Sequence, residues 1–237
     1  MATRFLEFAV PSSDVLESLG FYRDLGFTEL TTQDSISYAY AVVTDGRIMI
    51  GLHGIEDVEP SVRFVRPNVR EAVLKLGERG IEFEDVHLDE DELHRVSVRG
   101  PSGNRVTWLE ARTYSPPLED VGDSLLGRFL ELTFPVTELY EAAHFWAPYA
   151  ERVTGESKDP PRMRFDAGGL PLGLSETRDI KAPALAFIVD DTDGLQQRLD
   201  RTGISLDVGA LPAEAFATIR APEGSLLALY RKDFMQP

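Results

Sequence analysis

Residues 4–27 read RFLEFAVPSSDVLESLGFYRDLGF, and the tetrapeptide RFLE that opens this stretch returns at residues 128–131. At the same offset Pro11 is matched by Pro135, and Phe21-Tyr22 is matched by Phe145-Trp146. Later matches join Leu76, Gly80 and Ile81 to Leu199, Gly203 and Ile204, and residues 100–104 to residues 221–225. Because the matches keep their order and nearly constant spacing, the chain is predicted to be an internal duplication.

The first copy alternates the patterns of strands and helices. Residues 5–10 form a short apolar run, and Ser13-Asp14 then supplies a helix N-cap before an apolar helical face that ends at Gly26. The hairpin signal Asp45-Gly46 joins two further expected strands, at residues 38–44 and 47–53. A second unit is expected from a strand at residues 61–66, a helix at residues 68–78 and three strand-like runs that end at Glu110.

The second copy preserves this outline. Strands are expected at residues 130–134, 184–189, 218–220 and 226–231, and helices at residues 138–149, where Pro148 should disturb the end, and 193–201, capped by Asp191 or Thr192. The pattern therefore predicts an α+β fold of four βαβββ units, two in each copy. We expect a first module at residues 1–114, a linker at residues 115–127 and a second module at residues 128–237.

Composition narrows the expected partners. The 237 residues carry a formal net charge of −16 and contain no cysteine, which excludes disulfides, thiolate metal sites and a cysteine nucleophile. The N-terminus lacks the long apolar run of a signal peptide and no stretch could span a bilayer, so a cytoplasmic protein is expected. An acidic surface repels phosphate backbones and anionic lipids, so we expect neither nucleic acid nor membrane as a partner, whereas a cationic ligand is favoured.

Two short motifs carry a resemblance to a known superfamily. FYRDLGF at residues 21–27 and GPSGN at residues 100–104, set in paired βαβββ units, resemble the vicinal oxygen chelate superfamily. This is the group of glyoxalases, bleomycin resistance proteins and extradiol dioxygenases. The resemblance covers almost the whole chain, once per copy, and it implies curved mixed sheets that form cups lined by alternate strand residues.

Metal-using members of this superfamily place His or Glu ligands on the cup face of particular strands. The resemblance puts these positions on Phe5 and Phe129, Ser61 and Ala184, Thr107 and Ala228, and, less closely matched, near Ile50 and Leu172. A divalent cation needs several converging His or carboxylate ligands, and none of these residues is one. We therefore expect no metal and no cofactor.

Strand alternation provides a carboxylate for each cup instead. It assigns Phe5, Glu7 and Ala9 to one face of the first strand, and Phe129 and Glu131 to the same face of its counterpart. A carboxylate in the middle of an apolar strand is costly to desolvate, so it needs a partner, water or a raised pKa. The cup is thus expected to contain a paired or perturbed glutamate in each module.

Arginines on neighbouring strands are the natural partners of these glutamates. Arg63 is expected to pair with Glu7, and Arg162 or Arg164 with Glu131. Such a pair is either an interior ion pair of little net stability or a group that orients a ligand or moves a proton. Both interpretations stay open from the sequence.

Histidines add one further candidate. His53 ends a strand that should border the cup, its counterpart is Ser175, and an imidazole suits proton transfer near neutral pH, although a turn residue is the alternative. His87 and His94 flank an acidic turn, where a solvated hairpin tip is favoured over a metal site. The catalytic candidates are thus Glu7, Glu131 and His53, and the expected ligand-binding residues are Phe5, Arg63, Thr107, Tyr38, Tyr40, Phe129, Arg164 and Tyr230.

Three functions compete on these grounds. The first is metal-independent binding or sequestration of a small organic molecule in a cup, as in bleomycin resistance proteins. The second is a metal-independent isomerase, lyase or cyclase that uses a cup carboxylate as acid or base, and the third is a glyoxalase- or dioxygenase-type metalloenzyme with relocated ligands. A monomer, with its modules paired as a pseudo-dimer, or a homodimer is expected.

Overall fold

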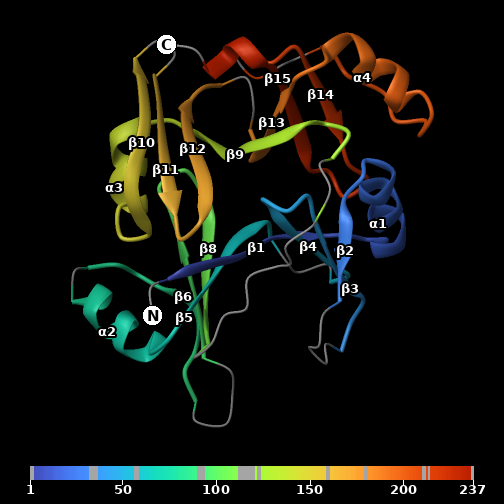
Figure 1. Ribbon diagram of the computed structural model, residues 1–237. Coiled ribbons are helices and arrows are strands. Elements are labelled where there is room, and N and C mark those ends of the chain that lie inside the picture. The colour runs from blue at the N-terminus through green and yellow to red at the C-terminus, as the bar shows by residue number, and fades with distance from the viewer. Residues whose placement is uncertain are drawn as a thin grey trace.

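The computed structural model of the protein describes residues 3–31, 37–55, 59–78, 80–89, 94–111, 121, 124–158, 161–178, 181–209, 212 and 214–235. These residues form two mixed β-sheets with four α-helices. In Figure 1 the strands of the first sheet, blue to green, lie below those of the second sheet, yellow to red. The predicted α+β fold of tandem βαβββ modules is confirmed.

The first sheet has eight strands in the order β2-β3-β4-β1-β5-β8-β7-β6. Its two units meet in the middle, where β1 pairs antiparallel with β5. Its elements are β1 (Arg4–Pro11), α1 (Val15–Asp24), β2 (Thr28–Leu30), β3 (Tyr40–Thr44), β4 (Met49–His53), β5 (Ser61–Arg66), α2 (Val69–Gly77), β6 (Glu84–His87), β7 (Arg95–Arg99) and β8 (Arg105–Glu110).

The second sheet has seven strands in the order β10-β11-β12-β9-β13-β15-β14. Its elements are β9 (Arg128–Val136), α3 (Leu139–Trp146), β10 (Ala150–Lys158), β11 (Pro161–Ala167), β12 (Leu170–Glu176), β13 (Ala184–Val189), α4 (Thr192–Leu199), β14 (Ala217–Arg220), β15 (Leu226–Arg231) and the 3₁₀ helix η1 (Lys232–Met235). Within the described part of the fourth unit, an isolated bridge between Asp207 and Thr218 takes the place of one expected strand.

Local sequence signals account for the helix ends. The Asp14 side chain accepts hydrogen bonds from the backbone N–H groups of Leu16 and Glu17 at the start of α1, and Asp191 caps α4 in the same way. α3 ends at Trp146, two residues before Pro148, as a proline requires. No helix in the described ranges is long and apolar enough to cross a membrane.

The module boundaries stay a prediction. Most of the expected linker, residues 112–120 together with residues 122 and 123, lies outside the described residues. The described end of the linker contacts the first module, because the Leu125 N–H donates to the Leu25 carbonyl at 2.8 Å. Directly after it, β9 begins at Arg128, where the second module was expected to start.

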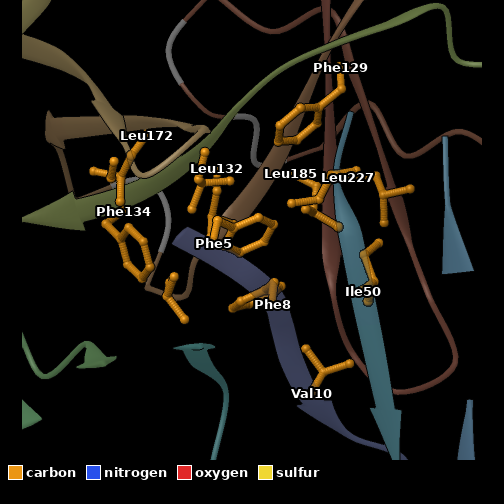
Figure 2. Packing of buried hydrophobic residues seen from close by; sticks show 14 of the residues in the cluster. Phe5, Phe8, Val10, Ile50, Phe129, Leu132, Phe134, Leu172, Leu185 and Leu227 are labelled. Atoms are coloured by element: carbon orange, nitrogen blue, oxygen red, sulfur yellow. The ribbon is translucent and has the colours of Figure 1, made fainter. Parts of the chain in front are cut away.

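One hydrophobic core joins the two sheets. It contains apolar residues of β1, β4, β5 and β8 as well as β9, β12, β13 and β15 in a single cluster. Aromatic contacts cross between the halves: the ring centroids of Phe27 and Phe187 lie 6.2 Å apart, and those of Phe64 and Tyr149 lie 5.8 Å apart. Figure 2 shows Phe5 of the first sheet between residues of the second. The two modules therefore share their interior.

A bulge at the start of each first strand corrects one expectation. The pairing of β1 with β5 shifts between Phe5 and Glu7, and the pairing of β9 with β13 shifts at the corresponding place, between Phe129 and Glu131. An extra residue breaks the strict alternation of side chains. Phe5 and Phe129 therefore lie in the shared core (Figure 2), and the prediction that they share a cup face with Glu7 and Glu131 is wrong.

Candidate functional site

Each sheet carries one buried glutamate on the face turned away from the shared core. Glu7 is 2% exposed and Glu131 is 1% exposed. We call the face of the first sheet that carries Glu7, Ser61, Arg63 and Thr107 the first cup, and the face of the second sheet that carries Glu131, Ala184, Ala186 and Ala228 the second cup. Alternate residues of the same strands, such as Phe8 and Leu132, point into the shared core.

Three side chains from neighbouring strands converge on Glu7 in the first cup. The Tyr40 hydroxyl donates to Oε2 at 2.6 Å, and Arg63 Nη1 donates to Oε1 at 3.0 Å. His53 Nε2 also lies 3.0 Å from Oε1. The predicted Glu7–Arg63 ion pair is thus present, and the structure joins Tyr40 and His53 to the same carboxylate.

His53 extends this network to Tyr38, whose hydroxyl lies 3.0 Å from Nδ1. An Nε2–H that donates to Glu7 leaves Nδ1 free to accept the Tyr38 hydroxyl proton. His53 is 1% exposed, whereas Tyr38 is only partly buried. Tyr38, His53 and Glu7 therefore form a continuous hydrogen-bonded chain from a partly exposed hydroxyl to a buried carboxylate, which is a geometry able to move a proton.

The surroundings of Glu7 favour its charged form. Burial raises the pKa of Glu7, but the hydrogen bond from His53, the charge of Arg63 and the hydrogen bond from Tyr40 outweigh that effect and place the pKa below its usual value. Glu7 is therefore ionised at neutral pH and acts as an acceptor for all three partners.

Replacing Glu7 by glutamine should lower the free energy of unfolding by about 1.5–3 kcal/mol at neutral pH, the range for hydrogen bonds to a charged group. Because the folded-state pKa is lowered, this contribution is complete above the pKa of about 4.3 of an unfolded glutamate and is lost as the pH falls through the folded-state value. Urea unfolding of both proteins from neutral to acidic pH measures the difference. A difference that is the same at every pH would contradict an ionised, paired Glu7.

Glu131 has a different set of partners in the second cup. Arg162 pairs with Oε1, and Arg164 Nε lies 2.7 Å from Oε2. The Thr133 hydroxyl donates to Oε1 at 2.7 Å. Both arginines named from the sequence therefore hold this carboxylate, and both come from β11.

The chain itself covers the second cup. In η1 the Phe234 ring stacks on Tyr230 with ring centroids 4.2 Å apart, and the guanidinium of Arg162 lies 4.9 Å from the centre of the Phe234 ring. Burial raises the pKa of Tyr230 to about 12, so its hydroxyl stays neutral. Tyr230 and Phe234 pack against an apolar cluster on this face that consists of Leu130, Ala184, Ala186, Ile188 and Ala228. Arg164 and Tyr230, which were expected to bind a ligand, thus contact other residues of the chain.

The two modules have a glutamate at the same position, but the arginines that pair with it come from different strands. In the first sheet Glu7 stands opposite Arg63 across the β1–β5 pairing, whereas Glu131 stands opposite Ala186 across the β9–β13 pairing. The cations of the second cup come from β11, on the other side of the carboxylate. The side of the cup that is polar in the first module is therefore apolar in the second.

Two glycines make room for the carboxylates. A methyl group built on Gly51 would overlap the Glu7 carboxylate, and one built on Gly173 would overlap the Glu131 carboxylate. Gly51→Ala and Gly173→Ala are therefore expected to lower the free energy of unfolding by about 1–3 kcal/mol, the usual cost of overpacking, in urea unfolding experiments. Gly20→Ala is the matched control, because nothing lies within 4 Å of a methyl group in that place on α1. Equal behaviour of all three variants would contradict the placement of the two glutamates.

A pocket of about 210 Å³ lies in the first cup beside Arg63. The hydroxyls of Ser97 and Thr107 lie on its wall, 3.0 Å apart. Its other lining residues are Ile55, Glu59, Ser61, Asp85, Arg95 and Arg105. Thr107, expected to bind a ligand, thus lies in this pocket with Arg63, whereas Tyr38, Tyr40 and His53 lie behind Arg63 in the network around Glu7.

Six lining residues were not predicted from the sequence: Ile55, Glu59, Asp85, Arg95, Ser97 and Arg105. A signal was present for Arg95, Ser97 and Arg105, because residues 95–99 alternate polar and apolar side chains as RVSVR, and residues 105–108 do so as RVTW. On the other side of β8, Trp108 lies in the shared core.

His87 and His94 are not among the residues that line the pocket of the first cup. His87 Nε2 lies 2.8 Å from Asp85, and His94 Nδ1 lies 2.6 Å from Glu110. Residues 90–93 between them, three of which are acidic, fall outside the described residues. Ile50 and Leu172, the less closely matched ligand positions, lie in the shared core.

The donors of the first cup do not fit a divalent metal ion. Glu7 and His53 supply two donors, but Arg63 Nη1 lies 3.0 Å from Glu7 and 3.2 Å from His53. A guanidinium, which keeps its charge at any physiological pH, thus lies where a metal would meet both. Glu131 is likewise held between two guanidiniums. Among the described residues, no three His, Cys, Asp or Glu side chains come together in a group that could hold a metal ion.

Comparison with solved structures shows which known proteins share this architecture. A catechol 2,3-dioxygenase superposes with a TM-score of 0.60 at 16% identity over 97% of this chain and 88% of its own. The homoprotocatechuate 2,3-dioxygenase of Arthrobacter globiformis superposes with a TM-score of 0.61 at 15% identity over 99% of this chain and 82% of its own. The 2,2',3-trihydroxybiphenyl 1,2-dioxygenase of Sphingomonas wittichii strain RW1 gives a TM-score of 0.58 at 12% identity, over 98% of this chain and 91% of its own.

These likenesses show a shared fold. No family model matches the chain, and no curated protein matches it. The chain has the two-module fold of extradiol dioxygenases, which is the fold of the vicinal oxygen chelate superfamily. The expected fold resemblance is confirmed.

Proposed function

We propose that the protein binds a small organic molecule in the pocket of the first cup, without a metal ion. The observation that carries this proposal is the pocket of about 210 Å³ on the cup face, where charged and hydroxyl groups converge. Concave sites with a few convergent polar groups are where proteins of this kind bind small molecules.

The composition of the wall supports binding rather than packing. Ser61, Ser97 and Thr107 are buried and carry their hydroxyls on a face that the shared core does not use. The Ser97 and Thr107 hydroxyls share one hydrogen bond at 3.0 Å, and each hydroxyl keeps further capacity to bond a ligand that has hydroxyl or carbonyl groups. The second cup offers no comparable surface, because Phe234 covers an apolar wall there.

The volume of the pocket favours a small ligand. Pockets for drug-sized molecules span about 300–1,000 Å³, and this pocket is smaller, at about 210 Å³. The proposed ligand is therefore a molecule with one ring or a short chain. Sequestration of a large drug is the less favoured form of the binding hypothesis.

A screen of one-ring compounds against the full chain tests the proposal. Compounds that raise the melting temperature should bind with a 1:1 stoichiometry in calorimetry. Thr107→Leu narrows the pocket and should lower their affinity at least tenfold. Phe234→Ala, which uncovers the second cup, should leave the same affinity unchanged. If Thr107→Leu left the affinity unchanged and Phe234→Ala increased it, the binding site would lie in the second cup. That result would contradict the proposal.

Addition of metal ions independently tests the proposal that the ligand is bound without a metal ion. Fe²⁺, Mn²⁺ or Zn²⁺ in stoichiometric amounts should leave the melting temperature unchanged, because Arg63 lies between the two donors of the first cup. Elemental analysis of protein purified after each addition measures retention. One equivalent of retained metal, lost in Glu7→Gln, would overturn this part.

The hydrogen-bonded chain from Tyr38 to Glu7 favours one second candidate, a metal-independent enzyme that moves a proton. Tyr38 is the exposed end of this chain, and His53 separates it from the ionised Glu7. For any substrate that is turned over, His53→Gln and Glu7→Gln should each lower kcat at least a hundredfold, the lower range of acid–base contributions of about 10²–10⁴. Variants with unchanged kcat would remove this candidate.

A further inference from the structure

The pocket of the first cup is lined by more cationic than anionic side chains. Arg63, Arg95 and Arg105 reach it, against the carboxylates of Glu59 and Asp85. Such a lining differs from the surface of the chain as a whole, whose net charge of −16 suggested a cationic ligand. The local arrangement of charges, rather than the total, determines what a pocket binds.

A single carboxylate serves two of these arginines. Arg105 Nη2 lies 3.2 Å and Arg95 Nη2 3.6 Å from the same Asp85 Oδ2. His87 Nε2 lies 2.8 Å from the other oxygen, Oδ1. Burial raises the pKa of Asp85, but the His87 hydrogen bond and the arginine charges outweigh this and lower it, so one ionised carboxylate faces two guanidiniums. This pair of arginines therefore holds one more positive charge than Asp85 balances.

The remaining acidic residue of the lining has another partner. Glu59 accepts from Arg99 Nη2 at 2.6 Å, and Arg99 lies outside the lining of this pocket. Arg63 is paired on its inner side with Glu7 at 3.0 Å. Arg99 is also paired with Glu84, at 2.9 Å. The excess of positive charge is therefore local to Arg95 and Arg105, the two guanidiniums that share Asp85.

The arginines of the pocket also have more hydrogen-bond donors than the surrounding residues have acceptors for them. The Nε atoms of Arg63 and Arg105 are buried and have no hydrogen-bond partner among the residues that the structure describes. A guanidinium has five donors in a planar fork that matches the two oxygens of a carboxylate. Because these two Nε atoms have almost no accessible surface, a ligand in the pocket meets the other donors of the guanidiniums.

We propose that the first cup selects a small molecule with a single anionic group, held between Arg105 and Arg95 while its polar substituents meet Ser61, Ser97 and Thr107. A carboxylate matches the arginine fork, and two guanidiniums that share one Asp85 oxygen can accommodate a second negative group beside them. This inference rests on the proposed function and specifies its ligand class, in the opposite sense to the cationic ligand that the net charge favoured.

Titration calorimetry on the full chain tests this with matched probes, namely 4-hydroxybenzoate, its neutral amide 4-hydroxybenzamide, and the cation benzamidine. The acid should bind at least tenfold more tightly than the amide, and benzamidine should bind most weakly. Arg105→Gln should remove the preference for the acid while sparing the amide. Arg128→Gln, an exposed arginine on β9, is the control and should leave all three affinities unchanged.

The outcomes separate this inference from the proposed function. Equal binding of acid and amide, or tighter binding of benzamidine, would overturn the anionic ligand class and leave the binding function standing. If neither acid nor amide binds, both are overturned. Because the partly buried Arg105 contributes an ion pair to the fold, Arg95→Gln, at a side chain that is 44% exposed, provides a second variant with the same expected loss of preference.

Discussion

Replacing Glu131 by leucine is expected to destabilise the protein by about 3–5 kcal/mol, the cost of removing one partner from a buried ion pair. The variant leaves Arg162 and Arg164 beside each other, with side chains that are only 11% and 21% exposed. Their mutual repulsion and lost hydrogen bonds are not relieved by water at this depth. Urea unfolding followed by circular dichroism measures the loss at neutral pH.

Two further variants show whether the unpaired charge causes this loss. Replacing Glu131, Arg162 and Arg164 together by leucine should restore most of the stability, because an apolar cluster has no charge to desolvate. Glu71→Gln, which breaks the exposed pair with Lys75, should change the stability little. A triple variant as unstable as Glu131→Leu would instead attribute the loss to altered packing.

Phe187→Ala is expected to cost about 3–5 kcal/mol and to unfold both modules in one transition. Phe187 is fully buried on β13 and contacts Phe27 of the first module at 6.2 Å and Phe129 of the second at 5.6 Å, measured between ring centroids. Because the core is shared, its loss weakens both sheets. Unfolding followed separately by tryptophan fluorescence, from Trp108 and Trp146, and by circular dichroism should give coincident midpoints.

The control for this variant is a large apolar residue outside the core. Leu16 on α1 is 78% exposed, so Leu16→Ala should leave the midpoint almost unchanged. Two separate transitions, with only the second module destabilised by Phe187→Ala, would show that the modules unfold independently.

The duplication and the buried ion pairs could be predicted from the sequence because they depend on local order. The repeated RFLE tetrapeptide aligned the two halves, and alternation from Glu7 along β1 selected Arg63 on the next strand as its partner. β15 spans Leu226–Arg231, as its apolar pattern indicated. Strand parity works wherever a strand pairs without interruption.

The bulge in β1 could not be predicted, because it depends on how the strand pairs with β5. The same parity that placed Glu7 correctly placed Phe5 wrongly, two residues earlier and across the register shift. Asp85 escaped for a similar reason, since it adopts a φ of 36° at a second register shift, between Glu84 and Val86, that brings its carboxylate to the pocket. Irregularities of this kind are set by tertiary pairing and leave no pattern in the chain.

Phe234 was also beyond the reach of the sequence. It stacks on Tyr230 and lies over Arg162 only because η1 returns the chain across the second cup after β15. Alternation predicted that Tyr230 faces this cup but does not define the path of the chain beyond the end of the strand. The difference between an open first cup and a covered second cup therefore emerged from the three-dimensional structure.

The interior common to both sheets has a consequence for synthesis on the ribosome. All strands of the first sheet are synthesised before Tyr149 and Phe187. Until then, Phe64 and Trp108 lack the contact with Tyr149, and Phe27 lacks the contact with Phe187. Aromatic surface that waits for its partners is prone to aggregate and to bind chaperones. The nascent chain thus passes through a stage in which the first module is complete but its aromatic core surface is still exposed. That stage ends only when the second module has been synthesised and packs against it.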